Sequence, residues 1–271
     1  MSIIAKLKEL SRFLGDKFVL SPKITHFKNA DVEMGKKNIL VIGVVLEDRV
    51  NHYEHISSVF SNSNTHNVEQ VWAVLKGNKK LASVTGVKHV YSDDFVPRSS
   101  LINSLLEPYL GKDYDYIMIT DDDIRLPKDF VDQFLVRQEQ YDFALAQPAR
   151  TPDSIISHWI TKQNKRATAR RTQFVEIGPL VSIRNDIQDL ILPLDTDSPM
   201  GWGLDYVWPY DLLANNKKMG IIDCVPIAHT LRETGKSYSS AKALEQMNDY
   251  LQSKPHLSVS DSHVVIDEFS K

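Results

Sequence analysis

Three consecutive carboxylates, Asp121, Asp122 and Asp123, are the most informative residues of the chain. They directly follow residues 116–120, a short and strongly apolar segment typical of a buried β-strand. Alternate side chains of an extended segment point the same way, so Asp121 and Asp123 can face one side together. Two carboxylates held this close repel each other, and a hard cation between them relieves the repulsion, so the pattern predicts a Mg²⁺ or Mn²⁺ site. The alternative is a solvent-exposed acidic turn that caps a helix beginning near Pro127.

A second group of residues surrounds Trp202, which has Gly201 and Gly203 as neighbours and Asp205 soon after. Glycines permit unusual backbone angles and the close approach of a ligand, and an indole face can stack on a sugar ring. Asp205, at the start of a predicted helix, can take a proton from an attacking hydroxyl as a general base. The competing interpretation makes Trp202 a core residue and Asp205 a helix N-cap, and a capping carboxylate can still be catalytic.

Basic side chains follow a predicted strand at residues 219–225. His229 can complete the coordination of a metal ion held by Asp121 and Asp123, although an isolated histidine is more often structural. Arg232 can bind a diphosphate, or it can belong to an ordinary solvated loop.

Strand and helix patterns alternate along the first half of the chain. Apolar runs predict strands at 39–46, 68–75, 87–91, 116–120 and 143–146. Shorter strands are predicted at 174–177, 180–183 and 219–225, and a helix at 236–251. The βαβα order predicts one α/β domain with a doubly wound, mostly parallel sheet flanked by helices. Ligands bind at the carboxyl ends of the strands in such sheets, which is where the three carboxylates are expected.

The composition is that of an ordinary globular protein, with 271 residues, 42% hydrophobic and 25% charged. A formal net charge of −3 argues against a nucleic-acid partner. A local basic cluster is read as a solvated face, with a phosphate cradle as the alternative: Lys162, Lys165, Arg166, Arg170 and Arg171. The single cysteine, Cys224, excludes an intrachain disulfide and fits a reducing compartment, and no run of ~20 apolar residues predicts a membrane span. We therefore expect a cytoplasmic protein.

The first 17 residues have an amphipathic helical pattern, with apolar side chains on one face and lysines and Arg12 nearby. The face can pack on the domain or contact the inner surface of a membrane peripherally. We expect a helical extension at 1–37, the α/β domain at 38–254 and a C-terminal tail at 255–271.

Ordered blocks of residues between 96 and 229 resemble a plant family of unknown function. Its label is "lysine-ketoglutarate reductase trans-splicing related", and its bacterial relatives are grouped with GT-A-type glycosyltransferases. The blocks are Val96-Pro97-Arg98 with Leu101, 114–117 leading into 121–123, 146–149, 174–177 with 179–181, 201–205, and 220–223 followed by His229. The plant pattern has a glutamate where this chain has Asp122, and it keeps the two outer aspartates.

The resemblance implies a metal-dependent transfer of a sugar from a nucleoside diphosphate sugar, with a UDP-sugar favoured. The acceptor would be a hydroxyl of a glycan or glycolipid. Residues 201–205 are also similar to the acceptor-side loop of inverting galactosyl- and N-acetylgalactosaminyltransferases, which implies that Asp205 is the base of an inverting transfer. A looser similarity at 97–103 implies that Arg98 touches the nucleotide.

The expected site has three parts. The metal ion, Mn²⁺ or Mg²⁺, is expected on Asp121, Asp123 and His229. The nucleotide sugar is expected to contact Arg49, Asp94, Arg98, Asp122 and Arg232. The acceptor or sugar pocket is expected to contain Trp202, Gly203 and Glu176 beside the base, Asp205.

Two other functions remain open from the sequence. A sugar-phosphate nucleotidyltransferase shares doubly wound sheets and acidic metal sites, but it usually has a glycine-rich basic loop after the first strand. Residues 45–49 contain no glycine at that position. A catalytically silent sugar- or nucleotide-binding module is the other alternative, and the intact acidic triplet and Asp205 argue against it.

Overall fold

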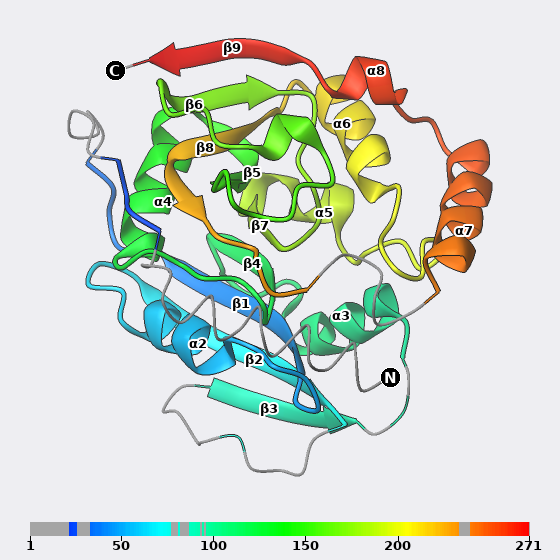
Figure 1. Ribbon diagram of the computed structural model, residues 1–271, viewed down its shortest axis with the longest axis horizontal. Helices are drawn as coiled ribbons and strands as arrows, with labels where there is room; N and C mark the ends of the chain where they lie inside the picture. Colours follow the sequence, from blue (N-terminus) through cyan, green and yellow to red (C-terminus); the bar gives the residue numbers. More distant parts are fainter. Residues whose placement is uncertain are drawn as a thin grey trace.

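Figure 1 shows the chain as a computed structural model, built around one β-sheet with helices packed on its two faces. The structure describes residues 22–25, 33–76, 81, 87–92, 94, 96–232 and 239–270. The helix expected within residues 1–17, and the membrane contact assigned to it, lie outside these ranges, as does most of the expected 1–37 extension. None of the described helices is long and apolar enough to cross a membrane.

The described strands and helices follow the alternation expected for the first half of the chain. The strands are β1 (Asn38–Leu46), β2 (Asn67–Leu75), β3 (Val87–Ser92), β4 (Tyr116–Asp121), β5 (Phe143–Arg150), β6 (Ala167–Thr172), β7 (Leu180–Arg184), β8 (Lys218–Ile227) and β9 (Val265–Ser270). The α-helices are α2 (Tyr53–Ser61), α3 (Arg98–Leu106), α4 (Phe130–Gln140), α5 (Gln188–Ile191), α6 (Leu204–Ala214), α7 (Ser240–Ser253) and α8 (Val259–Ser262). Short 3₁₀ turns are η1 (Glu107–Tyr109), η2 (Trp159–Thr161) and η3 (Asn185–Ile187).

The sheet is mixed, which corrects the expectation of a mostly parallel one. The strand order is β3-β2-β1-β4-β7-β5-β8-β6-β9. The pairs β3/β2, β2/β1, β1/β4 and β5/β8 are parallel, whereas β7 runs against β4 and β5, and β6 runs against β8 and β9. A buried antiparallel strand such as β7 is as continuously apolar as a parallel one, so its sequence does not reveal its direction.

Hydrophobic side chains pack on both faces of the central strands. Along β1, Leu40 and Ile42 join a cluster that includes side chains of α3 and α6, whereas Ile39 and Val41 join a cluster with α2 and α4. Gly43 leaves room for Trp72, because a Cβ atom there would lie 2.2 Å from the indole ring. The sheet is therefore the middle layer of an α/β/α arrangement.

The carboxyl ends of β1, β4, β5 and β8 meet at one edge of the sheet, because these four strands run in the same direction. Asp121 is the last residue of β4 and Arg150 is the last residue of β5. His229 lies two residues beyond the end of β8. β7 begins at the same edge, directly after a cis peptide bond between Gly178 and Pro179.

The end of the chain differs from the expected loose tail. β9 pairs with β6 and forms the outer edge of the sheet, as the red strand of Figure 1 shows. The ring of Phe269 stacks on Tyr141 at a centroid distance of 4.3 Å. The backbone N–H of Leu257 also donates to the carbonyl of Tyr206, at 3.0 Å. These long-range partners lie too far along the chain for a local pattern to predict them.

Candidate active site

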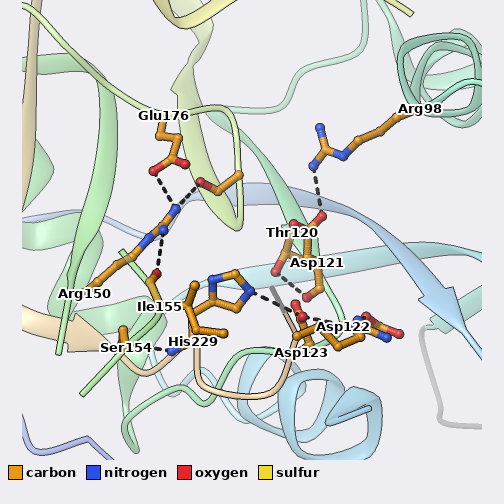
Figure 2. Close-up of polar contacts among 12 residues, drawn as sticks. Arg98, Thr120, Asp121, Asp122, Asp123, Arg150, Ser154, Ile155, Glu176 and His229 are labelled. Atoms are coloured by element: carbon orange, nitrogen blue, oxygen red, sulfur yellow. Dashed lines mark hydrogen bonds and ion pairs between the residues drawn. The ribbon is translucent and has the colours of Figure 1, made fainter. Parts of the chain in front are cut away.

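The acidic residue at the end of β4 faces a basic partner from α3. Arg98 Nη2 donates to Asp121 Oδ1 at 3.0 Å, as Figure 2 shows. The backbone N–H of Asp121 donates to the carbonyl of Pro179 at 2.8 Å. A Cβ atom at Gly178 would lie 3.2 Å from Asp121 Oδ2. Asp121 is therefore held at the sheet edge, close against the turn at Gly178.

The next two carboxylates are buried, so the triplet is not a solvent-exposed acidic turn. Asp122 Oδ2 accepts the backbone N–H of Leu46 at 2.8 Å and thereby ties the end of β1 to the end of β4. Asp122 Oδ1 also accepts from Arg232. Asp123 Oδ2 accepts from Arg232 Nε at 3.0 Å and lies 3.3 Å from His229 Nε2. The guanidinium of Arg232 thus bridges two carboxylates that would otherwise repel each other.

The three expected metal ligands do not form one coordination group in this structure. Asp123 and His229 contact each other, while Asp121 pairs with Arg98. In the described part of the chain, no three His, Cys, Asp or Glu side chains lie close enough together to hold a metal ion. His229 Nδ1 is nevertheless buried without a hydrogen-bond partner, which is a costly state for a nitrogen that can donate or bind a metal.

Arg150, at the end of β5, connects three segments of the site (Figure 2). Its Nη2 donates to Glu176 Oε2 at 2.5 Å and to the carbonyl of Gly178 at 2.9 Å. Its Nη1 donates to the carbonyl of Ile155 at 3.0 Å, and the Ile155 N–H donates to the carbonyl of His229 at 2.8 Å. Burial raises the pKa of Glu176, whereas Arg150 opposes this rise by stabilising the carboxylate.

Asp205 is a buried carboxylate in the first turn of α6. Gly203, with φ +96°, is the N-cap residue, so the structure does not support Asp205 as the cap. The Gly203 N–H donates to Asp205 Oδ1 at 3.2 Å. Burial, followed by the nearby negative charge of Glu176, raises the pKa of Asp205 to about 7. A carboxylate with this pKa suits proton transfer near neutral pH.

A cavity of about 360 Å³ joins several of these residues. Of the residues expected from the sequence, it is lined by Arg98, Asp121, Glu176, Trp202, Gly203, Asp205 and His229. Asp122, Asp123 and Arg232 are not among the lining residues. Trp202 is half-buried on the cavity rather than in the core.

Two residues expected on the nucleotide side, Arg49 and Asp94, do not line this cavity. Arg49 lies in the turn after β1, where its Nε is 3.9 Å from Asp48 Oδ1. Asp94 is exposed between β3 and α3.

Arg150, His158, Tyr206 and Met247 are among the lining residues that the sequence reasoning did not assign to the site. A charged residue that ends the fully buried strand β5 was the available signal for Arg150. His158 and Met247 come from segments whose approach to the site depends on long-range packing, and no local pattern marks them.

Comparison with known proteins supports the fold. No family model matches the sequence, and no curated protein matches it. The structure is of the GT-A type, and it is similar to the crystal structure of GalNAc-T7 with UDP, GalNAc and Mn²⁺. The TM-score is 0.53 at 10% sequence identity, and the match covers 73% of this chain and 44% of that chain. At this identity the likeness establishes the fold alone. It does not establish membership of the plant family that the sequence resembles.

Proposed function

We propose that the protein is a metal-dependent glycosyltransferase that uses a nucleoside diphosphate sugar, with UDP-sugars favoured. The observation that carries this proposal is the cavity in which Asp121, Trp202 and Asp205 meet at the carboxyl edge of a GT-A-type sheet. GalNAc-T7, which shares the fold, was crystallised with UDP, GalNAc and Mn²⁺. The single buried cysteine also fits a cytoplasmic location.

Asp121, Asp123 and His229 are the proposed ligands of a Mn²⁺ or Mg²⁺ ion. The contact between Asp123 and His229, and the unsatisfied Nδ1 of His229, support this assignment. When bound, such an ion neutralises the charge of a departing diphosphate. Arg98 and Arg232 already balance the carboxylates at this edge. They are the proposed diphosphate contacts, since guanidinium groups bind phosphate oxygens well.

The other end of the cavity is the proposed acceptor side. Trp202 offers an apolar face to a sugar ring, and Glu176, held by Arg150, can accept a hydrogen bond from a sugar hydroxyl. Asp205 would take the proton of the attacking hydroxyl in an inverting transfer to a glycan or glycolipid. Its raised pKa of about 7 supports this role, because the carboxylate can both release and accept a proton near neutrality.

The metal requirement is tested by titrating UDP into the protein with Mn²⁺ and, separately, with EDTA. Asp121→Asn and Asp123→Asn should weaken UDP binding in Mn²⁺ and keep the circular dichroism spectrum of the wild type. Asp249→Asn, which changes an exposed aspartate of α7, is the matched control and should bind UDP normally. Unchanged UDP affinity in EDTA would contradict the proposal.

The proposed base is tested with a panel of nucleotide sugars and product analysis. Asp205→Asn should keep donor affinity and lower kcat by ~10²–10⁴-fold, the usual contribution of a general base. The anomeric configuration of the product, measured by NMR, should be inverted. A retained configuration, or near wild-type turnover by the variant, would overturn the role of Asp205.

A further inference from the structure

A series of aromatic rings leads from the cavity wall to the protein surface. Tyr206 and His158 line the cavity. The ring of Phe174 packs between them, with its centroid 5.8 Å from Tyr206 and 4.6 Å from His158. His263 follows at 5.1 Å from His158, and Trp159 lies 6.1 Å from His263. The cavity and the surface are therefore joined by contiguous aromatic side chains.

Trp159, at the outer end of this series, is 64% exposed. No other large apolar side chain in the described residues is more than 57% exposed. The two residues before it, Ser157 and His158, both line the cavity, and Ser157 is exposed. Trp159 is therefore the next residue in the chain after two that line the cavity, and its indole is exposed at the surface.

Buried arginines hold the loop that carries Trp159. Arg150 donates to the carbonyl of Ile155 at 3.0 Å, and Arg170 donates to the carbonyls of Ile160 and Lys162, both at 2.9 Å. Both arginines are almost fully buried. The backbone is therefore held by hydrogen bonds on both sides of Trp159. A rigid aromatic anchor binds with little loss of conformational entropy.

A single exposed apolar residue is common on protein surfaces and needs no explanation by itself. Trp159 differs because it combines high exposure, a backbone fixed on both sides, and a ring contact with His263, which in turn contacts the lining residue His158. An indole has an apolar face and a polar N–H. This combination matches a pyranose ring, which has an apolar C–H face and hydroxyl groups at its edge.

We propose that Trp159 forms a subsite for the second sugar ring of the acceptor, counted outward from the ring that presents its hydroxyl to Asp205. The inference rests on the glycosyltransferase function proposed above and specifies its acceptor as an oligosaccharide or glycan chain of at least two rings. The ring at Trp159 supplies binding energy outside the reacting centre. Two-ring acceptors therefore bind more tightly than single sugars of the same type.

The test uses ¹⁹F NMR of the full chain labelled with 5-fluorotryptophan. The chain has four tryptophans, and Trp159→Phe assigns the signal of interest by its loss. Buried Trp72 serves as an internal reference. With UDP and Mn²⁺ present, we titrate glucose-, galactose- and N-acetylglucosamine-based oligosaccharides of two to four rings and the corresponding methyl glycosides. Oligosaccharides should shift the Trp159 and Trp202 signals, and methyl glycosides should shift Trp202 alone.

Trp159→Ala should then weaken the binding of the responding oligosaccharide about ten-fold, equivalent to ~1.4 kcal/mol, a usual cost of truncating a tryptophan contact. Its affinities for the methyl glycoside and for UDP with Mn²⁺ should not change. Tyr210→Ala removes another exposed aromatic side chain that does not line the cavity, and it should leave all three affinities unchanged.

Three results overturn the subsite. A Trp159 signal that stays in place while Trp202 shifts shows that the second ring binds elsewhere, and the proposed function then survives. A Trp159 signal that shifts with phosphatidylcholine or phosphatidylglycerol vesicles, but with no oligosaccharide, assigns the side chain to a lipid surface. No shift with any sugar, combined with no UDP binding, overturns both the subsite and the proposed function.

Discussion

Replacing Asp205 by asparagine should lower kcat by ~10²–10⁴-fold and at the same time stabilise the fold at alkaline pH. Burial and Glu176 raise the pKa of Asp205 from an ordinary 3.8 to about 7. A carboxyl group whose pKa is higher in the folded state binds more protons there, so its contribution to stability is complete below pH ~4 and is lost as the pH rises through ~7. A difference of about three pH units corresponds to ~4 kcal/mol at most.

The assay is urea denaturation of the wild type and of Asp205→Asn at about pH 5.5 and about pH 8.5. Integrating the proton binding of this one group predicts that the stability gap grows in favour of the variant by ~2 kcal/mol between these pH values. Asp249→Asn, on the exposed side of α7, should show no such growth. A gap that is the same at both pH values would refute the reasoning, because Asp205 would then be ionised at no cost in the folded protein.

Further substitutions separate the remaining roles. Arg150→Met should destabilise the fold and also weaken UDP binding in Mn²⁺, because Arg150 holds the Gly178 turn that lies against Asp121. Arg170→Met removes a buried arginine outside the cavity and should only destabilise the fold. Titration calorimetry and urea denaturation measure the two effects, and equal losses of UDP affinity would contradict a specific role for Arg150. Glu176→Gln removes a negative charge beside Asp205 and should move the acid limb of the kcat/KM profile to lower pH; an upward shift would disprove the coupling. Gly203→Ala, at φ +96° against α7, should cost ~1–3 kcal/mol by thermal denaturation, and an unchanged midpoint would exclude this strain.

The sequence predicted the parallel half of the sheet closely, because buried parallel strands are short apolar runs between helical patterns. The run at 39–46 became β1, and the run at 116–120 became β4. β6 was missed because its sequence is rich in charge. Arg170 was read as part of a solvated face, but it is buried and pairs with Asp223, 53 residues further along the chain. The 174–177 segment is not a strand. A local pattern contains no information about such distant neutralising partners.

The chemistry of the candidate site could be predicted in part, where short local motifs carry it. Asp121, Trp202 and Asp205 stand in short motifs whose residue types limit what they can do, and all three line the cavity. The partners that tune them are not in those motifs. Arg232 forms ion pairs with two of the three carboxylates, Asp122 and Asp123. The charge of Glu176, 29 residues earlier in the chain, raises the pKa of Asp205. These couplings arise only when the sheet edge has formed.

The packing of α7 against Gly203 has a consequence for the order in which the protein folds during synthesis. A Cβ atom at Gly203 would lie within 3.4 Å of Met247, Tyr250 and Leu251, so α7 closes directly over the loop that leads to Asp205. α7 begins 35 residues after Asp205 in the chain, and synthesis proceeds from the N-terminus. Once β1, β4, β5 and β8 have emerged from the ribosome, they can bring Asp121, Asp122 and Asp123 to the edge of the sheet. At that stage α7 does not yet cover the loop that ends in Asp205. Under the function proposed above, the nucleotide site would then form before the loop of the proposed base, Asp205, is covered.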